Sequence, residues 1–337
     1  MLGSTVADDQ EANVNRRQFL ILAGATALPA TARAQQNTVP TIGFLHLGSP
    51  IPFARQASAF RRGLSEEGFV EGQSVRVEYR YADSRDERLP AMASELVGRS
   101  VDVIAAIGPA AAAAAKTATS TIPIVFLVGT DPVADGLTAS LPRPGGNLTG
   151  VSMLSFDLAP KRLELILELI GQVGPIGMLT NGNNAYAEHM IGDMQQAARA
   201  KKVQVSVMKV SSDAEIEAAF STLVQLQTRA LIVDPEPFLT TRSERIVAFA
   251  ARHAIPAIYG WSLNVRAGGL ISYGPSLEAA NHQVGIYVGR ILKGETPANL
   301  PVQQPTRFEL TINLKTAEAL HLTVPQTLLA AADKVLE

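Results

Sequence analysis

The chain has 337 residues, 47% of them hydrophobic, and carries 29 Lys plus Arg against 31 Asp plus Glu. A net charge of −2 gives no basic surface of the kind that nucleic-acid binding requires, so we expect no nucleic-acid partner. The chain has no cysteine, so we expect no disulfide, no thiolate metal site, no cysteine nucleophile and no lipid anchor on an N-terminal cysteine.

The first 34 residues have the parts of a cleavable secretory signal. Arg16-Arg17 precede a mildly apolar run at 19–30, and the small-x-small site Ala32-Arg33-Ala34 follows. The paired arginines favour the twin-arginine route, although an ordinary Sec signal and an N-terminal helix of a cytosolic protein remain alternatives. We therefore expect a signal at 1–34 and a monomeric mature protein in the periplasm.

The mature chain begins with alternating strands and helices. We expect strands at 41–47, 75–82, 101–107 and 123–128, with helices at 52–67, 86–99 and 109–119. The central strands are almost wholly apolar, as in a parallel sheet buried on both faces. The alternation predicts a doubly wound, Rossmann-like α/β domain.

The alternation pauses at the Gly/Pro-rich stretch 143–147 and then starts again. We expect strands at 148–153, 175–180, 203–210, 230–234 and 256–259, and helices at 157–170, 184–200, 213–227 and 238–253. This second array predicts a second domain of the same build.

A further joint is expected at 268–274, followed by a helix at 276–292, an extended stretch at 301–312 and a short helix at 315–320. The predicted domains are 38–150 with 275–300, and 151–274 with 301–337. Several crossings between them would form a hinge and a cleft. Because ligands bind outside the carboxyl ends of the strands in open α/β sheets, the strand-end loops of both domains should line this cleft.

The loops of the first domain offer six candidate ligand contacts. Gly108 and Pro109 lead from a strand into a helix, where free N–H groups can hold a carboxylate, and Ala110 follows them. The alternative is that the alanines of this helix only allow close packing on the sheet. Thr130 and Asp131 could bind a ligand ammonium or hydroxyl, or form a turn. Ser49, after the strand that ends at His46, could contact the ligand or cap a helix.

Three loops of the second domain offer four more candidates. Asn183 and Tyr186 follow one strand, and Asp234 ends another and could bind an amine. Trp261 follows a third strand and could stack on a ring or belong to the core. Together the loops suit a small ligand with an anionic end near Gly108 and a polar or cationic end bound by Asp131 and Asp234.

Catalytic patterns are missing. The five histidines show no metal-ligand spacing, and the chain has neither a phosphate-binding loop nor a Gly-x-Ser-x-Gly elbow. We therefore expect no catalytic residue, no metal, no cofactor and no enzyme activity, although a racemase or hydrolase on the same fold remains an alternative.

Several blocks of sequence carry a resemblance to a known family. The strongest is LPRPGGNLTG at 141–150, and the others lie at 60–64, 68–73, 101–105, 122–126, 131–133, 136–137, 268–274, 291–294, 300–302 and 312–317. In these blocks the chain resembles the ABC-transporter substrate-binding family that includes tryptophan- and tyrosine-binding lipoproteins. Two departures are the absence of a lipid-anchoring cysteine and of Ser or Thr in Gly108-Pro109-Ala110.

The resemblance implies a type I periplasmic-binding fold and ABC permease and ATPase subunits as partners. It also implies a small ligand, such as an amino acid or aromatic acid, and supports Ser49, Pro109, Thr130, Asp131 and Asp234 as contacts. A periplasmic sensor subunit of the same fold remains an alternative to a transport receptor.

Overall fold

The computed structural model describes residues 39–171 and 174–337. The predicted signal at 1–34 lies outside the described residues. Residues 39 to 337 form one compact unit that contains two separate β-sheets. None of the helices in the described ranges is long and apolar enough to cross a membrane.

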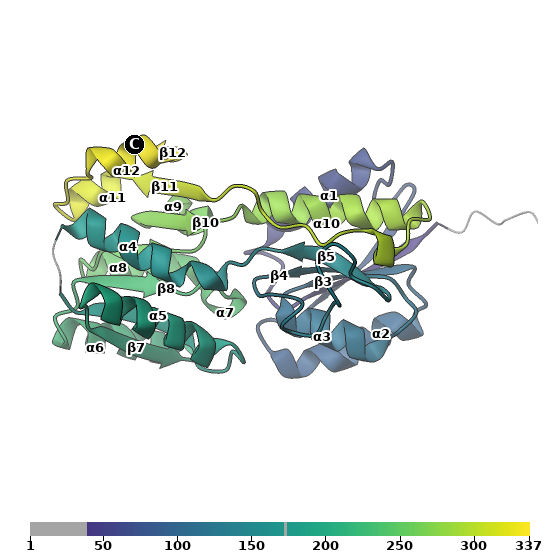
Figure 1. Cartoon of the computed structure of the whole chain (residues 1–337), viewed down its shortest axis with the longest axis horizontal. Helices are drawn as coiled ribbons and strands as arrows, with labels where there is room; N and C mark the ends of the chain where they lie inside the picture. Colours follow the sequence, from purple (N-terminus) through teal and green to yellow (C-terminus); the bar gives the residue numbers. More distant parts are fainter. Residues whose placement is uncertain (1–38, 172–173) are drawn as a thin grey trace, which may run out of the picture. The chain divides into compact units, whose positions relative to one another are not determined.

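The first sheet is wholly parallel, with the strand order β2-β1-β3-β4-β5. Figure 1 labels its strands β3, β4 and β5. Every residue of β3, β4 and β5 is buried, as the apolar sequence predicts. The strands are β1 (Thr41–His46), β2 (Arg76–Tyr81), β3 (Val103–Ile107), β4 (Ile124–Val128) and β5 (Leu148–Ser152).

Helices cover both faces of this sheet because successive strand residues point to opposite sides. Phe44 and Val125 pack with α1 and α10 in one core cluster, whereas Leu45 and Phe126 pack with α2 and α3 in another. The helices are α1 (Ala54–Glu66), α2 (Leu89–Gly98), α3 (Pro109–Ala118) and α10 (Leu277–Leu292). The doubly wound architecture expected from the alternation is confirmed.

The second sheet has the order β12-β11-β10-β9-β8-β6-β7, and only the β10–β11 pairing is antiparallel among its described strands. Helices α4 and α5 cover one face, and α6 and α8 cover the other (Figure 1). The strands are β6 (Ile176–Asn181), β7 (Val205–Val210), β8 (Ala230–Val233), β9 (Ala257–Tyr259), β10 (Ile271–Gly274), β11 (Glu309–Asn313) and β12 (Lys334–Leu336).

The helices of the second domain differ from expectation at one place. The helix expected at 238–253 is two helices, α7 and α8, because Glu236 caps a separate first turn. The helices are α4 (Ala159–Ile170), α5 (Ala187–Lys201), α6 (Asp213–Gln225), α7 (Pro237–Thr240), α8 (Ser243–Arg252), α9 (Ser262–Arg266), α11 (Leu314–Ala319) and α12 (Gln326–Ala331).

The stretch 268–274, expected as a joint, contains β10, which lies inside the second sheet. Its glycines serve close packing, since a Cβ on Gly274 would lie 2.2 Å from the carbonyl oxygen of Gly260. Of the extended stretch 301–312, only the part in β11 is a strand. The chain crosses between the sheets after β5, after β10 and before β11. The domain ranges stay a prediction, and their limit at 150/151 falls inside β5.

Helix α10 returns to the first domain and packs so closely on α1 that the backbones nearly touch. A Cβ on Gly285 would lie 2.1 Å from the carbonyl oxygen of Phe60, and one on Gly63 would lie 2.0 Å from that of His282. No side chain fits at these distances, so glycine at both positions is a requirement of the helix contact.

Gly285→Ala is therefore expected to destabilise the protein by about 1–3 kcal/mol, the usual cost of overpacking. Gly192→Ala is the matched control, because Gly192 also lies inside a helix and its Cβ would meet nothing within 4 Å. The control should gain up to about 1 kcal/mol of helix propensity. Urea unfolding of both variants measures the difference, and equal effects would contradict the close helix contact.

Candidate functional site

A cavity with about 510 Å³ of empty space, part of it open to solvent, lies at the carboxyl ends of the first-sheet strands. His46, Gly108, Gly129 and Met153 line it, and they lie at or just after the ends of β1, β3, β4 and β5. Pro235, Pro237, Thr240 and Trp261 from the second domain complete it, with Leu277 and Asn281 from α10. This is the place where open α/β sheets bind their ligands.

The cavity walls are largely aromatic and apolar. The rings of His46 and Phe53 lie 4.4 Å apart between centroids, at an angle of 52°. Phe156 and Trp261 add two further rings to the lining. Trp261 is also buried in a core cluster of the first domain. Its position is therefore compatible both with stacking on a ligand ring and with a role in the core. A lining of this kind suits the apolar body of a small molecule.

Three buried polar atoms of the lining have no hydrogen-bond partner: His46 Nε2, Ser155 Oγ and Asn281 Oδ1. The exposed fractions of these residues are 2%, 0% and 1%. An unpaired buried polar group costs about 1–3 kcal/mol, so three at one cavity need an explanation. They are three of twelve such atoms among the described residues, and these three are the ones whose residues line this cavity.

The hydrogen bonds of His46 and Asn281 determine what each offers a ligand. The Gly48 N–H donates to His46 Nδ1 at 2.7 Å, so the proton of the neutral ring lies on Nε2. Burial lowers the pKa of His46 to about 3, which keeps the ring neutral at physiological pH. Asn281 Nδ2 donates to the Leu277 carbonyl at 2.8 Å, which leaves Oδ1 as an acceptor. The cavity therefore offers a neutral N–H donor and a neutral acceptor.

Helix α3 begins at the cavity and brings the positive end of its dipole there, although the Gly108 N–H donates to the Leu127 carbonyl at 2.8 Å and Pro109 has no N–H. Gly108 has a φ of 105°, a left-handed value that favours glycine, and Pro109 opens the helix. The first N–H groups of a helix have no partner within it and carry partial positive charge. This end of the cavity favours an anion.

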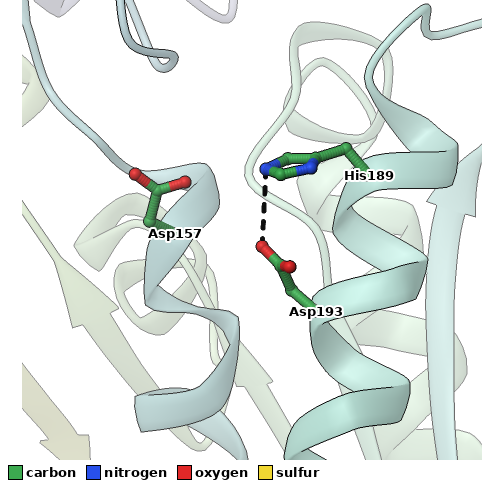
Figure 2. A group of neighbouring side chains, drawn as sticks. All are labelled: Asp157, His189 and Asp193. Atoms are coloured by element: carbon green, nitrogen blue, oxygen red, sulfur yellow. Dashed lines mark ion pairs between the residues drawn. The ribbon is translucent and has the colours of Figure 1, made fainter.

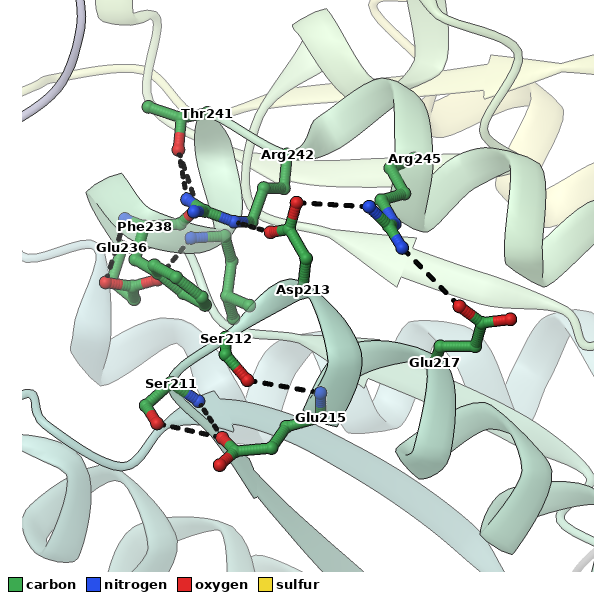
Figure 3. Close-up of polar contacts among 11 residues, drawn as sticks. Ser211, Ser212, Asp213, Glu215, Glu217, Glu236, Phe238, Thr241, Arg242 and Arg245 are labelled. Carbon is green, nitrogen blue, oxygen red and sulfur yellow. Dashed lines mark hydrogen bonds and ion pairs between the residues drawn. The ribbon is translucent and has the colours of Figure 1, made fainter. Parts of the chain in front are cut away.

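The second-domain side of the cavity is held by a helix cap. The Glu236 carboxylate accepts hydrogen bonds from the N–H groups of Phe238, at 3.1 Å, and Leu239 (Figure 3). Its burial raises the pKa of Glu236 to about 7. Arg242 lies 3.8 Å from the Phe238 ring centroid and pairs with Asp213 of α6 (Figure 3). These contacts fix Pro235 and Pro237, which line the cavity on either side of Glu236.

A buried arginine holds the backbone around the cavity. Arg162 of α4 donates to the carbonyl of Ser155 at 3.0 Å and to that of Tyr273 at 2.9 Å. Ser155 lies in the crossing after β5, and Tyr273 lies in β10, just before the crossing to α10. Asp234 supplies the opposite charge, while burial lowers the pKa of Arg162 to about 10.

Of the ten candidate contacts, Gly108, Pro109 and Trp261 line the cavity. Ala110 follows Pro109 in α3 but lines a different surface hollow. Asp234 is buried outside the lining, near Thr180 and Arg162, and its Oδ2 has no hydrogen-bond partner.

The remaining five lie in loops outside the cavity lining. Asp131 Oδ1 accepts from the N–H groups of its own turn, and the Thr130 hydroxyl donates to Asp135. Tyr186 is half-buried beside Asp135, Asn183 is exposed, and Ser49 is half-buried. Their ligand contacts stay predictions.

His46, Ser155 and Asn281 were not among the candidates. His46 lies near the end of the first predicted strand, and a polar residue at that position indicates a possible ligand contact. Asn281 is a polar residue within the apolar face of α10, a second signal. No sequence pattern around Ser155 indicates that it lines a cavity.

A separate group of side chains has the geometry of a possible metal site. Asp157, His189 and Asp193 offer ligand atoms within 4.8 Å of one another (Figure 2). His189 Nε2 and Asp193 Oδ2 are 3.5 Å apart on adjacent turns of α5. Asp157 and His189 are exposed, and exposed acidic groups commonly gather without an ion. We therefore do not assign a metal site to these three residues.

Burial raises the pKa of Asp234 to about 6, from an ordinary value of 3.8. A carboxyl with a raised folded-state pKa stabilises the fold fully below its unfolded pKa, and this contribution is lost as the pH rises through the folded pKa. At about 1.4 kcal/mol per pKa unit, the parent should lose on the order of 2–3 kcal/mol through Asp234 between pH 4 and pH 7.

Asp234→Asn removes this loss, whatever its effect on absolute stability. The free energy of unfolding of the variant relative to the parent should therefore improve by about 2–3 kcal/mol from pH 4 to pH 7. Urea unfolding of both proteins at the two pH values measures it. A difference independent of pH would mean that the folded state does not perturb Asp234.

Comparison with known proteins identifies the family. Residues 53–336 match the family model for ABC transporter substrate binding proteins. A curated tyrosine-binding protein from Clostridioides difficile is 27% identical over 300 residues, which cover 89% of this chain and 86% of that protein.

Two solved structures are similar over 88% of this chain. A conserved domain protein from Vibrio cholerae is 27% identical, with a TM-score of 0.80 over 99% of its chain. The ABC domain from Streptococcus pneumonia in complex with L-Trp is 25% identical, with a TM-score of 0.77 over 100% of its chain. The chain studied here belongs to the ABC transporter substrate-binding protein family and has the type I periplasmic-binding fold.

Proposed function

We propose that this protein is the periplasmic solute receptor of an ABC importer. It holds a small molecule in the cavity at the carboxyl ends of the first-sheet strands and delivers it to a permease and ATPase. The observation that carries the proposal is the set of three buried, unpaired polar atoms, His46 Nε2, Ser155 Oγ and Asn281 Oδ1, in an otherwise largely apolar lining. These three atoms would form hydrogen bonds with a ligand whose donor and acceptor groups lie opposite them.

The same lining supports binding rather than catalysis. Acid–base catalysis needs titratable groups with pKa values near the working pH. The one titratable side chain among the described lining residues is His46, and its burial lowers its pKa to about 3. A ring that stays neutral is a poor general base, but it is a dependable hydrogen-bond donor for a ligand.

Ligand binding is expected to close the two domains around the crossings after β5, after β10 and before β11, which lie beside the joints predicted at 146–151, 272–275 and 300–302. The purified protein should carry a small molecule that mass spectrometry identifies, and calorimetry with that compound should give saturable binding. X-ray scattering at saturation should show a smaller radius of gyration than the ligand-free protein. An unchanged radius with full occupancy would argue against a closing transport receptor.

Export is expected to depend on the paired arginines of the predicted signal. Changing both Arg16 and Arg17 to Lys should leave the precursor in the cytoplasm, as measured by cell fractionation and immunoblotting. Changing the paired Arg61 and Arg62 to Lys is the matched control, because these exposed residues of α1 lie outside the signal. Normal export of the first variant would show that the twin-arginine assignment is wrong.

A further inference from the structure

The cavity lining lacks a counter-charge for an amine. None of the described residues that line it carries a carboxylate, and its unpaired acceptors, Asn281 Oδ1 and the Ser155 hydroxyl, are neutral. An ammonium group buried without a negative partner is strongly destabilised, because it loses its hydration and gains no ion pair. An amino-acid zwitterion would leave its positive end unmatched here.

The two acidic residues nearest to the lining in sequence lie outside it and have other roles, although Asp234 Oδ2 has no hydrogen-bond partner. Glu236 accepts from the N–H groups of Phe238 and Leu239, and from Asn181 Nδ2 at 3.2 Å. Releasing that carboxylate would uncap α7. Asp234 is buried with Arg162 and Thr180, so the amine contact predicted for it would compete with the counter-charge of a buried guanidinium.

Donors, in contrast, run along the edge of the first sheet. His46 ends β1 and lies beside Ile107 of β3, the residue before Gly108 and the start of α3. Next along the sheet, a Cβ on Gly129, after β4, would lie 2.6 Å from Ser155 Oγ. The imidazole N–H, the helix start and the serine hydroxyl therefore share one edge. Neutral N–H and O–H groups beside the positive end of a helix dipole suit a carboxylate.

The rest of the lining determines the body of the ligand. Phe53, Phe156 and Trp261 present aromatic rings, and Met153 and the prolines fill the space between them. Aromatic rings pack well against one another and exclude water from the charged end.

Given that the protein is a solute receptor, we propose that its ligand is an aromatic monocarboxylate without an amino group. The carboxylate is held at the edge formed by His46, the start of α3 and Ser155, and the ring lies among the aromatic side chains. The proposal distinguishes this protein from the L-Trp-bound relative, with which it shares 25% of its residues.

Pairs of compounds that differ only in the α-ammonium test the proposal on the unaltered exported protein. The pairs are indole-3-propionate with L-tryptophan, and 3-(4-hydroxyphenyl)propionate with L-tyrosine. Calorimetry should give at least tenfold tighter binding for the acid in at least one pair. Indole-3-propionamide and tryptamine, which lack the carboxylate, should bind at least tenfold more weakly than indole-3-propionate.

The outcomes separate the ligand class from the receptor function. If both amino acids bind as tightly as their acids, the ligand class is wrong and the receptor function stands. The same conclusion follows if neither acid binds while another compound co-purifies and rebinds. If nothing co-purifies and no compound binds, the receptor function itself fails.

A pair of histidine variants tests the proposed edge. His46→Phe keeps a ring but removes the N–H donor, and it should weaken binding of the preferred acid at least tenfold. His282→Phe is the matched control, since His282 pairs with Glu66 on the surface of α10 and should leave affinity unchanged. Thermal unfolding verifies that both variants fold. Equal affinities of the two variants would overturn the role of His46.

Discussion

The arrangement of the cavity depends on one buried guanidinium. Arg162 holds the carbonyls of Ser155 and Tyr273, which lie at or beside two of the crossings between the sheets. A charge buried to this degree is tolerated because Asp234 neutralises it and both carbonyls accept its N–H groups. Since Ser155 also lines the cavity, the Arg162 side chain joins a crossing between the sheets to the cavity wall.

The Arg162 guanidinium fits here because Gly260 and Gly274 have no side chains. Cβ atoms on Gly260 and Gly274 would lie 3.3 and 3.5 Å from Arg162 Nη2, and much closer to neighbouring backbone or proline atoms. The segments around the guanidinium can approach one another only because these positions have no side chain. The glycine-rich motif at 268–274 is thus explained by packing within the second sheet, although its composition is typical of a flexible joint.

Much of the fold could be predicted from local sequence, because buried parallel strands are nearly continuous apolar runs. The strands at 41–46 and 124–128 lie within a residue of their expected bounds. The break between α7 and α8 was missed because it depends on Glu236 as an N-cap before Pro237. The site was harder to predict. A polar residue after a strand, such as Asp131, can satisfy its own turn, and Asn281 enters the cavity only because α10 packs back on α1.

The buried, unpaired polar atoms of the cavity favour binding of a ligand that can form hydrogen bonds with them. Each of His46 Nε2, Ser155 Oγ and Asn281 Oδ1 costs free energy while it lacks a partner. The surrounding packing keeps each atom in place, as the Gly48 N–H does for the imidazole ring. A ligand that pairs with these atoms recovers that cost without reorganising the protein, whereas a ligand that leaves one unpaired does not. Specificity then follows from the groups that the cavity leaves unpaired: an N–H donor, an amide acceptor and a hydroxyl that can donate or accept.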